Sequence, residues 1–336
     1  MKGNIPIPNL PEMEEVSLIL TVALVRRRFT QQAQPFYDAR GYNTTGSLAL
    51  KVWSETIDRC GELSAGLWQT TGILRDRHFV LTGYQPLGRS QYIEQNGIEP
   101  VLPRAYTLDI ETLALAGFRD RAARKLERRN RLGEMSLDQH QRYMADRESE
   151  EERAYRTGSL AATSGRVLSI AVQVGPQPEF LQYASSPVEC ERVFGIDTDG
   201  REEREEEALK GFIELMEGFK VDLDEIVGHN VSWFDLPFIY QRCLANGIAA
   251  RPTLESSGYN VFDTMRYWGL GDRRNTALDD IAWALGIESS KTAEVEGSRI
   301  HELYHNGKLV EIREYNLRDV RVTRKIYDRM ISVLGR

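Results

Sequence analysis

Hydrophobic and polar residues alternate with a period of two at several places after residue 104, which predicts β-strands. Leu108 and Ile110 alternate with Asp109 and Glu111 in the first of these segments. Residues 166–174 are predicted as a second strand, and residues 179–183 as a third strand after a Gly-Pro turn. Consecutive antiparallel strands are the expected arrangement at this point of the chain.

Apolar residues recur at three- and four-residue spacing farther along, which predicts amphipathic helices. The clearest is 203–219, and further helices are predicted at 235–246, 278–285 and 311–333. Residues 226–227 are predicted as a short strand that leads into Gly-His-Asn. Strands that alternate with helices are typical of an α/β layer fold.

The first 100 residues carry no chemical motif and are predicted as an N-terminal region of unknown role. Residues 16–25 are apolar over about half of the ~20 residues that a membrane-spanning helix needs, so we expect a buried strand or helix segment and no membrane association. Apolar residues within 48–68 approximate one face of a helix, and residues 78–84 are predicted as a strand that ends in a glycine turn. Glycines and prolines place the boundary near 95–103, so the second predicted domain is 101–336.

Composition changes this picture little. Apolar residues make up 41% of the 336 residues and charged residues 28%, as in a soluble globular protein. Lys and Arg total 43 against 50 for Asp and Glu, a formal charge of −7, so any nucleic-acid site must be local. Cys60, Cys190 and Cys243 form no CxxC pair, which predicts neither a disulfide framework nor a zinc site and favours the reducing cytoplasm.

A charged insertion at about 113–160 separates the first two predicted strands and far exceeds the ~2–5 residues usual in a hairpin connection. Its basic residues concentrate in one short stretch: Arg119, Arg121, Arg124, Lys125, Arg128, Arg129 and Arg131. A solvated helical hairpin is the favoured interpretation, and an arm that grips substrate phosphates is the alternative.

Two carboxylates share one side of the first predicted strand. Side chains alternate between the faces of a strand, so Asp109 and Glu111 point to the same side, one pleat apart. Like charges this close are unfavourable without a counter-charge, and a bound Mg²⁺ or Mn²⁺ would offset the repulsion with hard oxygen ligands.

Two further motifs carry candidate site residues. Asp235 ends the sequence GHNVSWFD at a predicted strand-to-helix junction, where it could also be a simple helix N-cap. Tyr315 and Asp319 are four residues apart, which places a phenol and a carboxylate on one face of a predicted helix.

Taken in order, the motifs DxE, NxxxFD and YxxxD resemble those of DEDDy 3′–5′ exonucleases. The resemblance covers about 104–334 and is strongest to the proofreading domain of family-B DNA polymerases and to stand-alone predicted exonucleases related to it. GHNVSWFDLPFI matches through the second motif and its flanks, residues 163–174 resemble the family's second strand, and residues 259–269 resemble a connecting segment before the third motif. The resemblance implies a ribonuclease H-like α/β fold, a mixed sheet flanked by helices, here with an additional N-terminal segment.

The resemblance also implies a role for each motif residue. Asp109, Glu111, Asp235 and Asp319 would bind two Mg²⁺ or Mn²⁺ ions, with Asp235 acting mainly through water ligands. Tyr315 would orient the attacking water, and Asn230 and Phe234 would position the terminal nucleotide. The implied function is a metal-dependent 3′–5′ exonuclease, with single-stranded DNA favoured over RNA as its substrate; the sequence does not indicate whether it has protein partners.

Two other functions stay open. His301-Glu302-Leu303-Tyr304-His305 matches the zinc-peptidase motif HExxH literally, but a turn follows at once and no third ligand stands out downstream. A catalytically silent nucleic-acid-binding module with an exonuclease-like fold is the main alternative. A nuclease assay with metal against chelator separates it from an enzyme.

Overall fold

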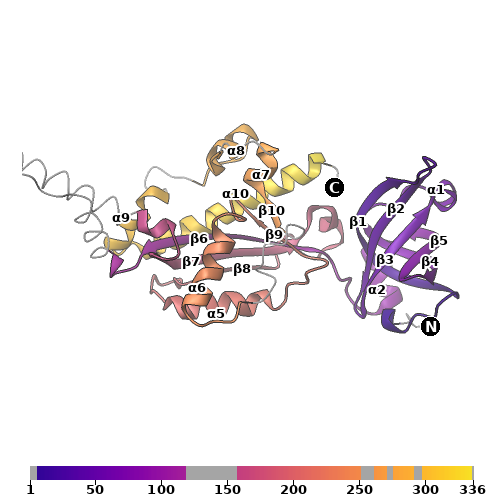
Figure 1. The fold of residues 1–336 in the computed structure, drawn as a ribbon, viewed down its shortest axis with the longest axis horizontal. Coiled ribbons are helices and arrows are strands. Elements are labelled where there is room, and N and C mark those ends of the chain that lie inside the picture. Colours follow the sequence, from indigo (N-terminus) through magenta and orange to yellow (C-terminus); the bar gives the residue numbers. More distant parts are fainter. Residues whose placement is uncertain (1–5, 119–156, 251–260, 271–274, 291–296, 335–336) are drawn as a thin grey trace, which may run out of the picture. The chain divides into compact units, whose positions relative to one another are not determined.

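The chain divides into two compact units in a computed structural model that describes residues 6–118, 157–250, 261–270, 275–290 and 297–334 (Figure 1). The first unit comprises Met1–Ala105, Gly175–Glu189 and Asp328–Arg336, and the second comprises Tyr106–Val174 and Cys190–Tyr327. Most of the predicted charged insertion, including its basic stretch, lies outside the described residues. Among the helices that are described, none is both long and apolar enough to cross a membrane.

The first unit contains a closed barrel with the strand order β1-β2-β3-β5-β4. Its strands are β1 (Glu15–Phe29), β2 (Pro35–Asn43), β3 (Gly46–Trp53), β4 (Gly66–Arg75) and β5 (His78–Pro86). Helix α1 (Ser54–Cys60) follows β3, helix α2 (Arg89–Asn96) follows β5, and short 3-10 helices lie at η1 (Ile7–Asn9) and η3 (Pro178–Tyr183). The strand predicted over 78–84 is thereby confirmed, and of the two alternatives predicted for 16–25 the structure has the strand.

The helical face predicted across 48–68 is wrong except for the seven residues of α1. Leu48, Leu50 and Val52 are buried in the barrel core while the residues between them are more exposed, which is the period of a strand. Spacings of four residues satisfy both periods, so the apolar positions alone did not separate the two structures. Residues 46–53 form a strand because β3 pairs with both of its neighbours in the closed barrel.

The strand predicted at 179–183 is also wrong, because Pro178–Tyr183 forms the 3-10 helix η3. Pro178 stands at the start of η3, where the fixed φ of proline suits a helical turn. The third strand of the second unit is instead β8 (Cys190–Phe194), which pairs antiparallel with β7 (Gly165–Pro176).

The second unit is built on a five-stranded sheet with the order β10-β9-β6-β7-β8. Its remaining strands are β6 (Arg104–Ala114), β9 (Glu225–Gly228) and β10 (Val261–Asp263). Parallel pairing of β9 with β10 and antiparallel pairing of β7 with β8 make the sheet mixed. Its helices are α5 (Glu205–Met216), α6 (Asp235–Ala245), α7 (Thr264–Gly269), α8 (Leu278–Ala284), α9 (Ile300–His305) and α10 (Leu309–Leu334), with 3-10 turns η2 (Gly158–Leu160) and η5 (Gly297–Arg299). The predicted fold class, a mixed sheet flanked by helices, is confirmed.

Helices cover both faces of this sheet, with α5 and α6 on one side and α10 on the other (Figure 1). Leu108 and Ile110 of β6 pack in the core that α5 and α6 complete. Since neighbouring side chains on a strand point to opposite faces, Asp109 and Glu111 project toward the α10 side. The strand parity predicted from the sequence therefore brings both carboxylates to one face.

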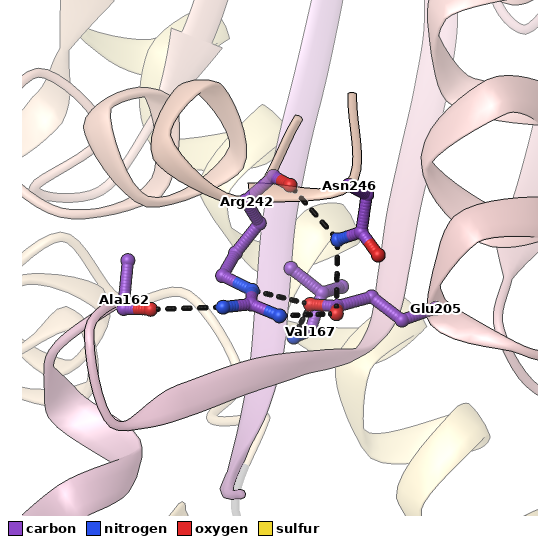
Figure 2. Close-up of polar contacts among 5 residues, drawn as sticks. All are labelled: Ala162, Val167, Glu205, Arg242 and Asn246. Atoms are coloured by element: carbon purple, nitrogen blue, oxygen red, sulfur yellow. Dashed lines mark hydrogen bonds and ion pairs between the residues drawn. The ribbon is translucent and has the colours of Figure 1, made fainter. Parts of the chain in front are cut away.

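A buried ion pair connects α5, α6 and the start of β7 (Figure 2). Glu205 at the start of α5 accepts hydrogen bonds of 2.8 and 2.6 Å from Nε and Nη2 of Arg242 on α6. Its oxygens also accept from the backbone nitrogen of Val167 at 2.7 Å and from Asn246 at 3.2 Å, while Nη1 of Arg242 donates to the carbonyl of Ala162. This network fixes the far end of α6, the helix that begins with Asp235.

Candidate active site

Three carboxylates from two elements converge in the second unit. Asp109 and Glu111 come from β6 and Asp319 comes from α10, and one oxygen of each lies within 4.8 Å of the others. In the described part of the chain, this is the only group of three or more potential metal ligands. Glu111 and Asp319 are each 9% exposed, so the charges are largely removed from water.

The electrostatics of this cluster suit a divalent cation. Burial raises the pKa of Asp109 well above its ordinary value, and the charges of Asp235, Asp319 and Glu111 raise it further. Burial also raises the pKa of Glu111, followed by the charges of Asp319 and Asp235. Grouped carboxylates that resist ionisation are stabilised by a hard cation with oxygen ligands, so the residues fit Mg²⁺ or Mn²⁺.

Asp235 lies beside the three-carboxylate cluster and is only 2% exposed. It is the first residue of α6, Phe234 occupies the N-cap, and no side chain caps the helix. The Oδ1 atom of Asp235 instead accepts a hydrogen bond of 3.1 Å from the backbone nitrogen of Ile110, between the two acids of the first motif. Burial raises the pKa of Asp235 to about 7, against the lowering effect of backbone hydrogen bonds. The simple N-cap interpretation therefore does not describe this residue.

Tyr315 lies on α10 one turn before Asp319 and is 5% exposed. Its ring packs in a small core with Leu113 and Leu168. Burial raises the pKa of its phenol, and the negative charges of Asp319, Glu111 and Asp109 raise it further. Because the charges of these three acids act on the phenol, its hydroxyl lies next to the cluster, on the helical face predicted from the four-residue spacing.

Asn230 and Phe234 lie in the loop between β9 and Asp235, and neither belongs to the carboxylate cluster. Asn230 has a φ of 61°, a left-handed conformation that asparagine tolerates better than most residues. A Cβ on Gly228 would lie 2.5 Å from Cβ of Val231, so the start of this loop requires glycine. Phe234 is half-buried and its ring lies 5.6 Å from that of Phe238.

Asp263 organises this loop and was missed by the sequence analysis. Its Oδ1 accepts from the backbone nitrogen of Asn230 at 3.0 Å, and its Oδ2 accepts from that of Ser232 at 3.1 Å. The same carboxylate caps α7 by accepting from the backbone nitrogens of Met265 and Arg266. The sequence offered one signal for Asp263: it ends a short apolar segment and directly precedes a helix.

Asn316 was also missed, although it lies next to Tyr315 in the third motif. Its Nδ2 donates a hydrogen bond of 2.7 Å to Oδ2 of Asp109, and its Oδ1 accepts one of 2.9 Å from Oγ of Ser169. Asn316 is fully buried. Asn316 stands in the sequence between Tyr315 and Leu317, which are both buried. A buried amide requires polar partners, so this position could have indicated that Asn316 contacts other site residues.

The His301–His305 pair lies on α9, a helix of only six residues that ends at His305. The two Nε2 atoms are 3.1 Å apart, and Glu302 forms an ion pair with Arg299. No third ligand among the described residues completes a metal group with this pair. The geometry gives the zinc-peptidase interpretation no support.

Comparison with known proteins confirms the resemblance stated from the motifs. Residues 181–336 match a family described as a predicted 3′-5′ exonuclease related to the exonuclease domain of PolB. The matched residues include the second and third motifs, with Asn230, Asp235, Tyr315 and Asp319, and exclude the first motif on β6.

The structure is also similar to that of the family B DNA polymerase from the hyperthermophilic archaeon Pyrobaculum calidifontis. The TM-score is 0.46 at 14% sequence identity, over 94% of this chain and 46% of the polymerase chain. This chain thus spans about half the length of that polymerase chain. The comparison with curated proteins gave no match.

Proposed function

We propose that this chain, whose residues 181–336 match predicted 3′–5′ exonucleases, is a two-metal-dependent exonuclease that removes nucleotides from the 3′ end of single-stranded DNA. The convergence of Asp109, Glu111 and Asp319 within 4.8 Å carries the proposal. Three carboxylates that come together from two elements and are largely removed from water are unfavourable unless a cation is bound, and phosphodiester hydrolysis is a reaction that such cations assist.

Each acidic residue has a distinct part in this proposal. Asp109, Glu111 and Asp319 would hold two Mg²⁺ or Mn²⁺ ions, which when bound stabilise the entering and leaving oxygens of phosphoryl transfer. Asp235 would act through water ligands, since its Oδ1 is already engaged with the backbone nitrogen of Ile110. That bond also fixes the strand segment between Asp109 and Glu111.

Tyr315 would position the attacking water. The raised pKa keeps its phenol protonated at neutral pH, so it does not act as a base; its proton is directed to Asp319, and its oxygen can accept a hydrogen bond from water. Asn230 and Phe234 would contact the terminal nucleotide from the loop that Asp263 holds in place.

The decisive test is digestion of 5′-labelled single-stranded DNA and RNA of the same sequence, with Mg²⁺, Mn²⁺ or EDTA. We expect progressive shortening from the 3′ end, faster on DNA, that EDTA abolishes. Asp109→Ala should retain less than about a tenth of the activity because a metal ligand is lost. Asp199→Ala, which changes an exposed aspartate of the same unit, is the matched control and should behave like the parent protein.

Metal-dependent thermal stability provides a second readout. Mn²⁺ should raise the melting temperature of the parent protein and leave that of Asp109→Ala nearly unchanged, because binding to the folded state alone is stabilising. Binding of the oligonucleotide without any cleavage by the parent protein would favour the silent binding module instead.

A further inference from the structure

Strands β1, β2 and β3 of the barrel carry aromatic and basic side chains on their outer side. In the strand register, Phe36 lies between Arg28 and Trp53, and Asp38 lies between Arg26 and Lys51. Tyr37 and Ala39 of β2 belong to the barrel core, so the alternate residues of β2 point outward. We call this surface the basic–aromatic face; it consists of Arg26, Arg28, Phe36, Asp38, Arg40, Lys51 and Trp53.

A β-bulge in β1 creates this face. Before the bulge, Leu18, Leu20 and Val22 point into the core. The register shifts between Ala23 and Arg26, at Leu24, whose φ is 54°. After the shift Val25 packs against the core, so Arg26 and Arg28 turn outward beside the aromatic residues.

The aromatic part of the face is open to solvent. The rings of Phe36 and Trp53 lie 5.3 Å apart, and Trp53 is 42% exposed. Arg28 lies opposite Phe36 in the register of β1 and β2, so a cation stands on the same side as these rings. Exposed aromatic rings with cations nearby are the usual platform on which unpaired bases stack.

The charge of the face opposes that of the whole chain. Four cations lie around one carboxylate, Asp38, which pairs with Arg28 at 2.8 Å. The ion pairs found among the described residues include none with Arg26, Arg40 or Lys51. In a chain of net charge −7, this local excess of positive charge is complementary to a polyanion.

We propose that the basic–aromatic face binds single-stranded nucleic acid, with bases stacked on Phe36 and Trp53 and phosphates paired with Arg26, Arg40 and Lys51. A single strand offers unstacked bases to the aromatic rings and phosphates to the basic side chains at the same time. In a duplex the faces of the bases are stacked on one another and cannot reach the rings. The inference deepens the proposed exonuclease function by giving its substrate class a second binding site on the same chain. An acidic protein segment or a second copy of the chain would be the other occupants of such a surface.

The test measures binding of a fluorescein-labelled oligothymidylate to the full chain by anisotropy over a range of salt concentrations. All variants carry Asp109→Ala so that the oligonucleotide stays intact. Trp53→Ala should weaken binding by about fivefold or more, the loss expected for one stacked base, with little change in salt dependence. The double variant Arg26→Glu, Lys51→Glu should make the negative slope of log K against log salt shallower by about 1.4, which corresponds to two lost phosphate contacts on a single strand.

Arg75→Glu with Arg77→Glu is the matched control, because it makes the same charge change at exposed residues elsewhere on the barrel. This variant should bind like the parent. Unchanged affinity in both face variants would overturn the inference, with thermal unfolding used to show that each variant is folded. Two further outcomes would also overturn it. One is equal competition by polyglutamate of matched charge; the other is a dimer in sedimentation that Trp53→Ala dissociates.

The two proposals fail in different ways. A parent protein that binds oligothymidylate through this face but never shortens it would contradict the exonuclease proposal alone. Cleavage with the same KM in the parent and in both face variants, each made without Asp109→Ala, would contradict only the inference about the barrel.

Discussion

Asn316 on α10 donates a hydrogen bond of 2.7 Å to Oδ2 of Asp109 on β6, so the third motif directly fixes a side chain of the first. Ser169 of β7 in turn donates to Oδ1 of Asn316, which orients the amide with its nitrogen toward Asp109. Asn316 therefore holds one carboxylate oxygen of Asp109 and restricts the orientation of the whole carboxylate. Polar groups that orient metal ligands in this way contribute to metal affinity.

Substitution of Asn316 tests this relationship. Asn316→Ala should weaken Mn²⁺ binding or slow cleavage by about 10- to 100-fold, the range found when a residue that supports a metal ligand is removed. Mn²⁺ titration calorimetry measures the first effect independently of activity. Asn306→Ala, at an exposed asparagine, is the control. Normal Mn²⁺ affinity together with normal kcat in Asn316→Ala would show that the bond to Asp109 has no functional role.

Asp263 should be required for the shape of the second motif. Asp263→Ala removes the acceptor for backbone nitrogens of Asn230 and Ser232 and the cap of α7. We expect a loss of about 2–4 kcal/mol in the free energy of unfolding, from charge-assisted hydrogen bonds and a lost helix cap. KM for the oligonucleotide should rise more than kcat falls. Asp263→Asn keeps one acceptor oxygen and should be intermediate in urea unfolding; equal stability of all three proteins would contradict the prediction.

Local periodicity was sufficient to predict the parts of the site that lie on single elements. The pairing of Asp109 with Glu111 follows from strand parity, and the pairing of Tyr315 with Asp319 follows from one helical turn. Both spacings are fixed by backbone geometry. The order of the three motifs then indicated the resemblance to 3′–5′ exonucleases, and with it the mixed sheet that the structure contains.

Contacts between distant segments could not be predicted in the same way. Asn316 and Asp109 are 207 residues apart, and Asp263 reaches Asn230 across 33 residues. Such bonds depend on which strands become neighbours, and hydrophobic periodicity does not encode strand order. The errors at 48–68 and 179–183 have a related cause. There, barrel closure and a proline-initiated turn overrode an apolar pattern compatible with more than one structure.

Tyr315 and Asp319 should respond differently to substitution. Tyr315→Phe keeps the ring but removes the hydroxyl beside the cluster, so the chemical step should slow by roughly 10- to 1000-fold with metal affinity nearly unchanged. Asp319→Asn changes the charge of a proposed metal ligand and should lose both metal binding and turnover. Metal titration and single-turnover rates distinguish the two. Full activity in Tyr315→Phe would exclude the proposed positioning of water.

The ion pair between Glu205 and Arg242 should stabilise the second unit substantially. The side chain of Arg242 is 10% exposed and that of Glu205 is 11% exposed, so removing one charge leaves the other largely buried and without a counter-charge. Glu205→Gln should therefore lower the free energy of unfolding by about 3–5 kcal/mol. The neighbouring Glu206→Gln breaks only an exposed pair with Lys210 and should change stability little. Similar urea midpoints for the two variants would contradict the assignment.

The contribution of Glu205 should also depend on pH in a defined direction. Burial alone would raise the pKa of Glu205, but hydrogen bonds from Arg242, Val167 and Asn246 outweigh it and hold the pKa below its ordinary value. The folded state then binds fewer protons than the unfolded state in the pH range between the folded pKa and about pH 4.5, where an unfolded glutamate titrates. The stability difference between the parent and Glu205→Gln should be fully present above that pH and shrink as the pH falls through the folded pKa. Urea unfolding of both proteins between neutral pH and pH 3 measures this difference, and a gap that widens on acidification would show that Glu205 is not held ionised by this network.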